Sequence, residues 1–468
     1  MRVLRERAGA EGRRLRRVFA ALILLGLAAG GGLWPAPAAA SLDSTISAAL
    51  RQSGVSGSST GVFVWDLDAA RLIYADNASA KLAPASNMKI ATSAAALMRW
   101  DLEQRFITEL LVPDVPVYGG VLFGDVYLRG QGDPSLSTRS YQRDELDFTT
   151  ASFEAFARQL KKDGVEKIRG RVRGDASWFD KQEAVASWEP SLRSECGPLS
   201  ALSGNQGLNE GKRVHAPATW AAQLYTQALR KVGIKVTGKP GSGKAPSTTR
   251  LARRQYSAPL PRILKHMNKE SDNFFAEMLL KGLGKDFYDS GSTAAGTKAT
   301  RAALAACGVK RGSYTIEDGS GLSYHDRLTA AGIAQVLGVL RQRADFDVFY
   351  SSLAIAGEDG TLRERMQGTA ADGNAHAKTG TLNVAVCLSG YVTSANGHEV
   401  AFAILMNGSH VGWTKATKAQ DTIVVALANA TLPGARVLTA TPNLRQHARS
   451  AFEAVRPVGR SLQPCVQP

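Results

Sequence analysis

The chain is poor in the residues that build metal sites and disulfide frameworks. Its 468 residues include only four cysteines, which is too few for the disulfide framework of a small secreted domain. One disulfide in an oxidising compartment stays open, but the spacing does not identify the pair, and no pair has zinc-site spacing. Cys387 lies in an apolar run and is predicted to be a buried thiol. The seven histidines show neither His-x-x-x-His nor His-Glu-x-x-His spacing. We therefore expect neither a metal nor a cofactor.

Long apolar segments are also scarce. The run from Val18 to Leu33 is short of the roughly 20 residues that span a bilayer. It lies between a basic segment, Arg2 to Arg17, and the small residues Ala38-Ala39-Ala40. This order is typical of a secretory signal peptide, and a retained membrane anchor is the alternative. We expect cleavage before Ser41 and a location outside the cytoplasm, in the periplasm or cell envelope.

Charge is unbalanced but not concentrated in blocks. The chain has 57 Lys and Arg against 41 Asp and Glu, a formal net charge of +16. Seven arginines and two glutamates lie in the first 40 residues, so the remainder carries about +11. Scattered basic residues leave no nucleic-acid footprint. An exported basic protein suits an anionic cell-wall polymer or a peripheral association with a membrane, and simple solubility is the alternative explanation.

The length and the changing texture of the sequence predict more than one domain. A chain of 468 residues exceeds the usual size of a single core. Short strand-like runs and Gly, Pro and Asp turns over 102–254 indicate an inserted domain. The glycine-rich stretch 238–243 resembles a phosphate-binding loop, but Pro240 and the absence of Ser or Thr after Lys244 favour a linker. Residues 41–101 and 255–438 would form one split domain, and 439–468 a loosely ordered tail.

Apolar periodicity predicts the main elements of the split domain. Residues 61–67 and 71–74 read as a hairpin. A helix is expected from Asn87 to Trp100, because Ala, Leu, Met and Ile recur there without Gly or Pro. Residues 383–392 and 399–406 are apolar and enclose an Asn-Gly turn, which predicts a second hairpin.

Three short motifs carry hydroxyl, amide and amine groups in a fixed order. They are Ser86-Asn87-Met88-Lys89, Ser271-Asp272-Asn273 and Lys378-Thr379-Gly380. Serine is a weak nucleophile without a base, and Lys89 lies one helical turn after Ser86, where it can reach the hydroxyl. Lysine acts as a base only when burial or a second cation such as Lys378 lowers its pKa. The order of these motifs therefore predicts a serine acyl-transfer site without histidine.

The remaining residues of the motifs have predicted roles around the same serine. Ser271 is expected to relay a proton, and the Asn273 amide to orient Lys89 or hold a substrate amide. Lys378 and the hydroxyls of Thr379 and Thr381 are expected to bind a substrate carboxylate. The backbone N–H groups of Ser86 and of Thr381, which follows Gly380, are candidates for the oxyanion hole.

The motif order, the long insert and four further segments resemble the class C penicillin-binding proteins, the D-alanyl-D-alanine carboxypeptidase/endopeptidase family. The further segments are Gly132–Leu136, Gly174–Phe179, Asp318–Ser323 and Asp359–Leu362. The resemblance spans Leu42 to Leu432. It implies an α/β (α+β) fold, with a penicillin-recognising serine transpeptidase/β-lactamase-like domain. That domain would have a five-stranded antiparallel sheet flanked by helices, plus an inserted mixed α/β domain.

The resemblance also implies a function. The family hydrolyses the terminal D-Ala-D-Ala bond of peptidoglycan stem peptides, often cleaves cross-links, and is inhibited covalently by β-lactams. Ser86 would form the acyl-enzyme, with Lys89 as the base. A β-lactamase is one alternative, although the Glu-x-x-Leu-Asn segment of class A enzymes is missing. A non-catalytic penicillin-sensing or wall-binding protein is another.

The chain departs from the family pattern in two places. Residues 201–205 run almost directly into 214–217, so a third family domain within the insert is expected to be absent. Tyr324 stands where the family often has an arginine that meets the substrate's side-chain acid. Asp175 resembles the insert aspartate that approaches the substrate's free amine, so the stem-peptide preference stays open. For Asp133 we expect a turn role.

Overall fold

The computed structural model describes residues 41–55, 57–408 and 412–434. The expected signal segment, the tail over 439–468 and Cys465 lie outside these residues. None of the helices in the described ranges is long and apolar enough to cross a membrane.

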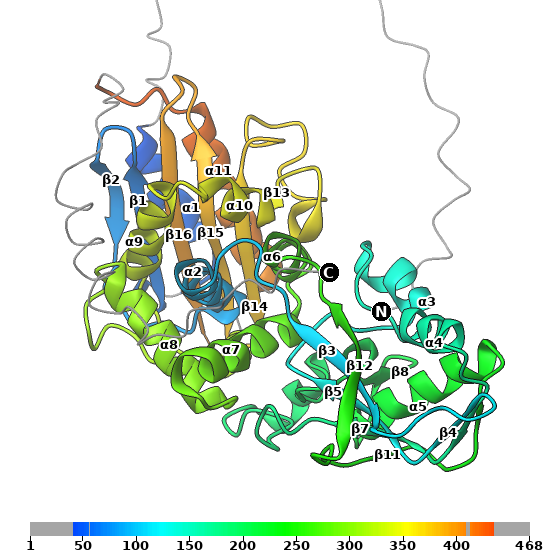
Figure 1. Ribbon diagram of the computed structural model, residues 1–468. Helices are drawn as coiled ribbons and strands as arrows, with labels where there is room; N and C mark the ends of the chain where they lie inside the picture. The colour runs from blue at the N-terminus through cyan, green and yellow to red at the C-terminus, as the bar shows by residue number, and fades with distance from the viewer. Residues whose placement is uncertain (1–40, 56, 409–411, 435–468) are drawn as a thin grey trace, which may run out of the picture. The chain divides into compact units, whose positions relative to one another are not determined.

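An antiparallel sheet forms the centre of the first domain (Figure 1). Its strand order is β13-β14-β15-β16-β1-β2. The strands are β1 (Thr60–Asp66), β2 (Arg71–Asp76), β13 (Ala354–Ile355), β14 (His376–Leu382), β15 (Ala385–Thr393) and β16 (Glu399–Asn407). Both expected hairpins are present. The sheet has six strands rather than the predicted five, because the two-residue β13 pairs with the first residues of β14.

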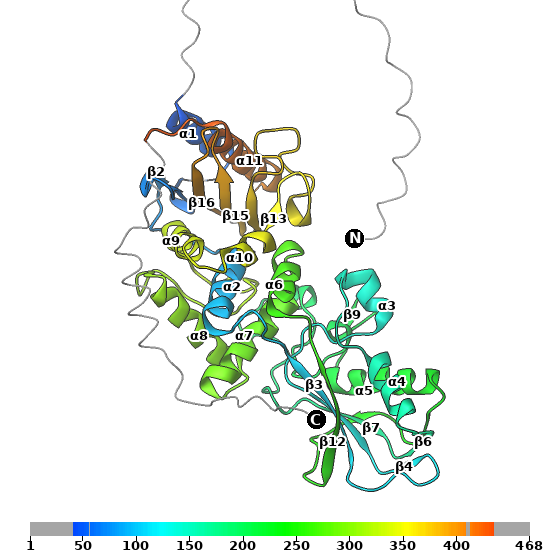
Figure 2. The same cartoon turned by 45° about the horizontal axis from the view of Figure 1, so that its top comes forward.

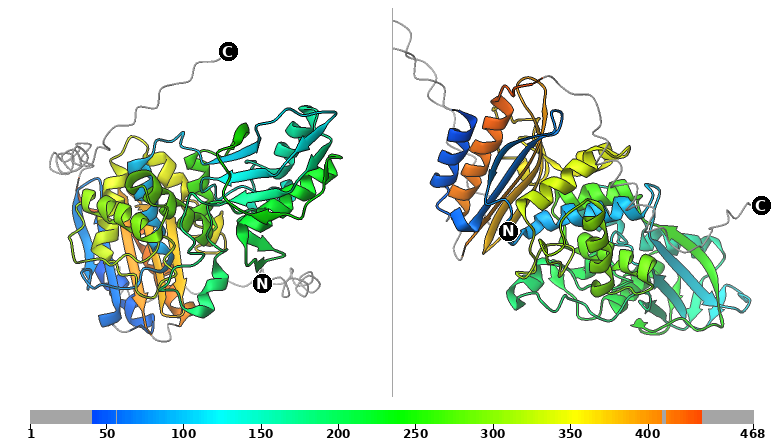
Figure 3. Two further views of the ribbon diagram at one scale, coloured as in Figure 1. Left: turned by 60° about the horizontal axis from the view of Figure 1, so that its bottom comes forward. Right: turned by 90° about the vertical axis from the view of Figure 1, so that its left-hand side faces the viewer.

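Helices cover both faces of this sheet, as Figure 3 shows for α1 (Leu42–Gln52) and α11 (Trp413–Asn429) on one side. Alternate residues of β16 serve the two layers, as the period of a strand requires. Phe402 and Ile404 pack toward the core that includes α1 and α11, whereas Ala403 and Leu405 pack toward the core on the other face. A strand buried on both faces explains the continuous apolar run seen in the sequence.

The second face of the sheet carries the helix on which the first motif lies. This helix, α2 (Met88–Arg99), is buried along almost its whole length, because its alanines allow neighbouring helices to approach. Its neighbours are α7, α8 and α9. The helices of this layer after α2 are α6 (Leu260–Lys269), α7 (Asn273–Tyr288), α8 (Thr293–Ala306), α9 (Ala330–Arg341) and α10 (Phe346–Ser352).

Residues 102–256 build three smaller sheets, of five, three and two strands, with a core of their own. The five-stranded sheet has the order β11-β7-β5-β3-β12 and mixes parallel and antiparallel pairs, and Figure 2 shows β3 beside β12. The separate core supports the division into an insert over 102–254 and a split domain, which we propose. The elements are β3 (Ile107–Pro113), β4 (Val121–Phe123), β5 (Val126–Gly130), α4 (Phe153–Lys162), β6 (Lys167–Arg169), β7 (Val172–Asp175), α5 (Pro217–Lys231), β10 (Lys235–Val236), β11 (Gly241–Ser242) and β12 (Thr249–Tyr256).

The linker prediction for 238–243 was wrong. Gly241 and Ser242 form the edge strand β11, which pairs in parallel with β7. A Cβ at Gly238 would lie 2.8 Å from the Arg171 Cβ and 3.0 Å from the Gly170 carbonyl oxygen, so glycine is needed for close packing. The glycines therefore allow neighbouring backbone segments to pack closely. Composition alone does not distinguish this role from flexibility.

Part of the insert leaves its own core and packs beside α2 and α7. Phe179, Trp188 and Leu199 belong to the same buried cluster as the helices on the second face of the main sheet. The path from 205 to 214 contains only a 3-10 turn, η5 (Asn205–Gly207), and the short hairpin of β8 (Leu208–Asn209) and β9 (Lys212–Arg213). The segment 179–201 thereby reaches the region where the three motifs meet.

Candidate active site

Ser86 lies in a 3-10 turn, η2 (Ala85–Asn87), immediately before α2. The preceding residue, Ala85, has a φ of +47°, a left-handed conformation that is costly for alanine and common at functional sites. The turn is packed against Gly321, where a Cβ would lie 1.8 Å from the Ala85 carbonyl oxygen. Only glycine at 321 leaves room for the conformation that presents the half-buried Ser86.

Lys89 is fully buried and its amine is held by three acceptors. Lys89 Nζ lies 2.9 Å from Ser86 Oγ, 2.7 Å from Asn273 Oδ1 and 2.8 Å from the Ser320 carbonyl oxygen. Burial lowers the pKa of this amine to about 8, although Asp318, Asp272 and Glu277 oppose the shift. A lysine with this pKa is partly neutral near pH 7, and the neutral form can accept a proton from Ser86 Oγ.

The buried carboxyl group of Glu277, which no sequence motif predicted, holds the backbone that contacts Lys89. Glu277 Oε1 accepts hydrogen bonds from Gly319 N at 3.0 Å and Ser320 N at 2.8 Å. Its Oε2 is buried without a hydrogen-bond partner among the described residues. Burial, reinforced by the charge of Asp318, raises the pKa of Glu277 to about 8. Glu277 thus fixes the backbone whose Ser320 carbonyl oxygen accepts from Lys89.

Asp318 folds the neighbouring loop around its own carboxylate. Its Oδ1 accepts from Gly321 N at 2.7 Å. Its Oδ2 accepts from Ser323 N and from the Trp188 indole N–H, both at 2.8 Å. The indole belongs to the insert, so the insert contributes directly to the loop that contacts Lys89 and the Ser86 turn.

The second motif opens α7. Asp272 caps this helix, since its Oδ1 accepts from Phe275 N at 2.9 Å. Burial by itself raises the pKa of Asp272, but hydrogen bonds from His266, Phe275 N and Gln206 hold it below its usual value. Asn273, the first residue of the helix, accepts from Lys89 and donates from Nδ2 to the Glu195 carbonyl oxygen at 2.8 Å. Both ends of the Asn273 amide are therefore fixed.

Ser271 has a φ of +57°, the same left-handed strain that Ala85 shows. Its side chain is half-buried, two residues before the amide that contacts Lys89. Strained non-glycine residues at two of the three chain segments of the site are consistent with a functional constraint on both. The proton-relay role of Ser271 stays a prediction.

The third motif lies on β14. Lys378 is fully buried, and its Nζ donates to the Thr379 carbonyl oxygen at 3.0 Å. Burial, together with the charge of Lys89, lowers the pKa of Lys378 well below its ordinary value. Asn87 Nδ2 donates to the Lys378 carbonyl oxygen at 3.0 Å, which ties β14 to the Ser86 turn. A Cβ at Gly380 would lie 2.9 Å from the Pro84 carbonyl oxygen, so glycine permits this approach.

The structure brings together four of the predicted residues through direct or shared contacts: Ser86, Lys89, Asn273 and Lys378. Thr379 Oγ1 donates to Thr361 Oγ1 at 2.8 Å. Thr381 is exposed two residues further along the same strand, so both threonines point to one face.

Asp175 lies elsewhere, at the end of β7. It is buried, and its Oδ1 and Oδ2 accept from Ser177 N and Ala245 N, each at 2.9 Å. The turn role expected of Asp133 is confirmed, because its Oδ1 accepts from Ser135 N at 2.8 Å. Tyr324 packs against the core and accepts at its carbonyl oxygen from Arg327 at 2.6 Å.

The thiols of the described part of the chain are structural. Cys196, Cys307 and Cys387 are free and buried, as was predicted for Cys387. Within the described ranges, no group of three or more His, Cys, Asp or Glu side chains is arranged to hold a metal ion.

Comparison with known proteins gives consistent matches. The model of the D-Ala-D-Ala carboxypeptidase 3 (S13) family matches residues 42–202 and 197–430. A D-alanyl-D-alanine carboxypeptidase of Actinomadura sp. (strain R39) is 30% identical over 83% of this chain and 84% of its own length. D-alanyl-D-alanine carboxypeptidase DacB of Haemophilus influenzae is 26% identical over 78% of this chain and 88% of its own.

Solved structures show the same fold. Penicillin binding protein 4 (dacB) from Haemophilus influenzae aligns with a TM-score of 0.68 and 22% identity. The alignment covers 88% of this chain and 99% of that one. The same protein in complex with a novel β-lactam aligns with a TM-score of 0.60 and 21% identity, over 88% of this chain and 99% of that one.

Proposed function

Because the chain belongs to the D-Ala-D-Ala carboxypeptidase 3 (S13) family, we propose that it removes the terminal D-alanine of peptidoglycan stem peptides through an acyl-enzyme on Ser86. It is a serine-type D-Ala-D-Ala carboxypeptidase by membership. The observation that carries the residue assignment is the 2.9 Å contact between Lys89 Nζ and Ser86 Oγ, with Lys89 buried and its pKa lowered to about 8.

Acylation follows from these positions. Neutral Lys89 accepts the Ser86 proton while Oγ attacks the carbonyl carbon of the penultimate D-alanine. The N–H groups of Ser86 and Thr381 would receive the developing oxyanion, and one such donor commonly contributes on the order of 3 kcal/mol. The C–N bond then breaks, and protonated Lys89 returns the proton to the departing amine, with Ser271 as the relay. In hydrolysis, Lys89 accepts a proton from water while the water oxygen attacks the acyl carbon. The ester C–O bond then breaks, and protonated Lys89 returns the proton to Ser86 Oγ.

Carboxylate binding falls to Lys378, Thr379 and Thr381. The low pKa of Lys378 belongs to the site without substrate, where burial and the charge of Lys89 outweigh the opposing charge of Glu270. A substrate carboxylate favours the charged form, so we expect binding to take up a proton. The same site would accept a cross-linked stem if the leaving amine belongs to a neighbouring peptide, which is the basis for an additional D,D-endopeptidase activity.

Further proposals concern inhibitors, selectivity and location. A β-lactam carries a carboxylate and an acylating carbonyl, so it would acylate Ser86 as the peptide does. Asp175 is the candidate for the substrate's free amine, but both of its oxygens already accept backbone hydrogen bonds, so this role needs a local change at 177 or 245. Export rests on the signal-like segment before Ser41.

The decisive experiment is the intact mass of the protein after exposure to benzylpenicillin, combined with D-alanine release from a stem pentapeptide. We expect a single persistent adduct and D-alanine release, both abolished in Ser86→Ala. Ser292→Ala, which removes the cap of α8, is a matched control and should retain both. Destruction of penicillin without an adduct would indicate a β-lactamase. A folded protein that neither forms the adduct nor releases D-alanine would contradict the proposal.

A further inference from the structure

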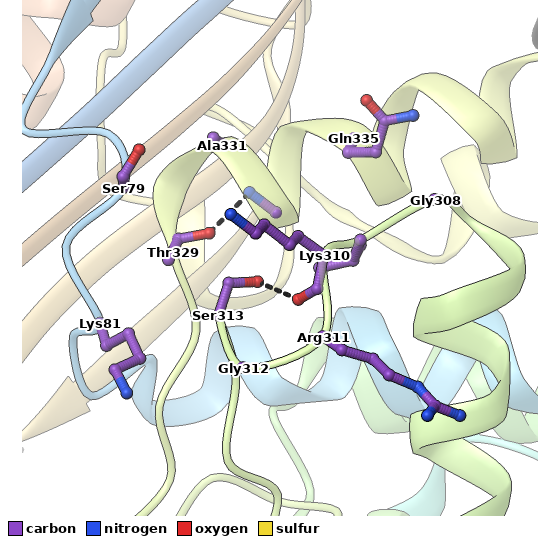
Figure 4. A pocket seen from close by; sticks show the side chains of 12 residues that line it. Ser79, Lys81, Gly308, Lys310, Arg311, Gly312, Ser313, Thr329, Ala331 and Gln335 are labelled. Carbon is purple, nitrogen blue, oxygen red and sulfur yellow. Dashed lines mark hydrogen bonds between the residues drawn. The ribbon is translucent and has the colours of Figure 1, made fainter.

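A cavity of about 520 Å³ lies beside the start of α9, away from the three motifs. Figure 4 shows its lining: Lys81 comes from the segment after β2, and Lys310 and Arg311 from the turn after α8. A second cavity of about 450 Å³ adjoins α8 and includes Lys298 and Arg301. Arg311 lines both cavities, so they form one continuous surface, which we call the basic groove.

The five cations of the basic groove have no counter-charge within it. No Asp or Glu lines either cavity. None of the five forms an ion pair with a carboxylate of the described residues. Elsewhere the pattern differs: on β12, Arg250, Arg253 and Arg254 are each paired with a carboxylate. An unneutralised set of this kind creates a positive potential that attracts anions.

The turn that carries Lys310 and Arg311 is ordered before any ligand arrives. Ser313 donates to the Lys310 carbonyl oxygen from its backbone N at 3.1 Å and from its hydroxyl at 2.6 Å. Gly308 and Gly312, with φ of +79° and +84°, allow the turn to close. Preorganised cations lose less conformational entropy on binding than cations on a mobile loop.

The backbone N–H groups at the N-terminus of α9 offer an anion few free donors. Gly332 N donates to Thr329 Oγ1 at 2.9 Å, and Ala331 N donates to the Ala78 carbonyl oxygen at 3.0 Å. With these donors occupied, an anion in the groove would be held by side-chain amines and guanidinium groups. Arg301 already donates to Thr297 Oγ1 and to the Ile316 carbonyl oxygen, so it contributes mainly charge. Arg311 is the guanidinium that suits phosphate, which accepts paired hydrogen bonds from such a group.

We propose that the basic groove binds an extended polymer that carries phosphate groups along its chain, as an anchor to the cell wall. Cations distributed over two joined cavities match repeated charges better than one small anion. Two chain segments that line the groove continue directly into segments of the active site. Lys81 precedes Ser86 by five residues, and the 308–314 turn leads through Ile316 into the loop of Asp318. A bound polymer would therefore keep the enzyme at its insoluble substrate. This role rests on the proposed function.

The test is fluorescence anisotropy of labelled inorganic polyphosphate with the full chain and two charge-reversal variants. Lys310→Glu/Arg311→Glu alters the groove, whereas Lys161→Glu/Lys162→Glu changes the net charge equally at exposed positions of α4. We expect the groove variant to raise Kd at least tenfold and the α4 variant less than twofold. Loss of two phosphate contacts should also reduce the slope of log Kd against log salt by about 1.5.

Equal losses in the two variants, or equal affinity for poly-D-glutamate, would overturn the proposal, because either result indicates attraction by net charge alone. Absence of salt-dependent binding by the unaltered protein would overturn it as well. The benzylpenicillin adduct is measured on both variants and is expected to be retained, so failure of the groove and failure of the catalytic assignment are distinguishable.

Discussion

At the residue scale, Lys89 combines a buried amine with three oxygen acceptors. Burial disfavours the ammonium form, whereas the charges of Asp318, Asp272 and Glu277 favour it, so the pKa lies at about 8. This balance makes proton transfer from Ser86 feasible at neutral pH. It also makes the reaction sensitive to any nearby group whose charge changes in the same range.

We therefore predict that kcat for D-alanine release, measured at saturating substrate where Lys378 is already paired with the substrate carboxylate, rises with pH up to about 8 and then levels off. Below that value Lys89 is increasingly protonated, and activity should fall about tenfold per pH unit, because only the neutral amine accepts the Ser86 proton. The measurement is release from a stem pentapeptide between pH 5.5 and 9.5. A flat profile between pH 6 and 8 would contradict a base with this pKa.

Glu277 is predicted to act on Lys89 as a positioning residue through Ser320. Glu277→Gln keeps an oxygen that can accept from Gly319 N and Ser320 N. It removes the negative charge that Glu277 gains as the pH rises through its pKa of about 8, and this charge raises the Lys89 pKa. We expect near-native folding and a rising limb of the pH profile displaced to lower pH. Glu277→Ala removes the acceptor too and should lower kcat roughly 10- to 100-fold, about 1.4 to 2.8 kcal/mol.

The control for this pair is Asp286→Asn. Asp286 is a second buried carboxyl group of α7, with its pKa raised by burial, and it accepts from the Trp100 indole N–H rather than from the 319–320 backbone. Its variant should leave the pH profile in place. The same displacement in both variants would refute a specific role for Glu277.

Short motifs of fixed spacing predicted Ser86, Lys89, Asn273 and Lys378 as one site, and the structure brings these residues together. The sequence did not reveal Glu277, which lies in the largely apolar segment 274–283 and contacts backbone N–H groups 42 and 43 residues further along the chain. Its one signal was an acidic residue where a buried helix was expected. Asp175 shows the opposite limit. A motif predicted a substrate contact for it, but the motif could not show that both carboxylate oxygens already accept backbone hydrogen bonds.

At the element scale, the Ser86 turn depends on a close backbone approach. We predict that Gly321→Ala destabilises the protein and slows acylation by benzylpenicillin, because a Cβ there would lie 1.8 Å from the Ala85 carbonyl oxygen and φ is +84°. The left-handed backbone alone costs alanine about 1–2 kcal/mol. The contact with Ala85 should add to this cost and displace Ser86. Urea unfolding and the acylation rate measure the two effects.

Gly312→Ala separates these two contributions. Gly312 has the same φ of +84°, but a Cβ there would meet nothing within 4 Å. This variant should lose only the conformational part of the stability and retain the acylation rate. Equal behaviour of the two variants would show that the Ser86 turn does not depend on Gly321.

The long elements were predictable because each contains its own pattern. The hairpins β1–β2 and β15–β16 follow from apolar runs and turn residues, and α2 from a helical run without Gly or Pro. The strands β11 and β13 have two residues each and are defined by their partners β7 and β14, so no local pattern could reveal them. The same limit made a close-packed glycine segment look like a linker.

At the scale of the whole molecule, the insert completes the active site as well as forming its own core. Asn273 Nδ2 donates to the Glu195 carbonyl oxygen, and the Trp188 indole N–H donates to Asp318. Both contacts join residues of the predicted insert to groups that surround Lys89. Motif spacing could not reveal this coupling, because it depends on where the segment 179–201 packs after folding.

Trp188→Phe tests the coupling, since it preserves most of the buried ring and removes only the donor to Asp318 Oδ2. Loss of a hydrogen bond to a buried carboxylate should cost about 1.5–3 kcal/mol of unfolding free energy. Because Asp318 also orders the loop that presents Ser320 and Gly321, we expect acylation by benzylpenicillin to slow as well.

Trp100→Phe is the matched control: its indole donates to Asp286 Oδ2 at 2.9 Å, away from the loop. It should lose comparable stability and retain its acylation rate. If both variants acylate at the native rate, the insert stabilises the fold without tuning the site, and the contact between Trp188 and Asp318 has no part in catalysis.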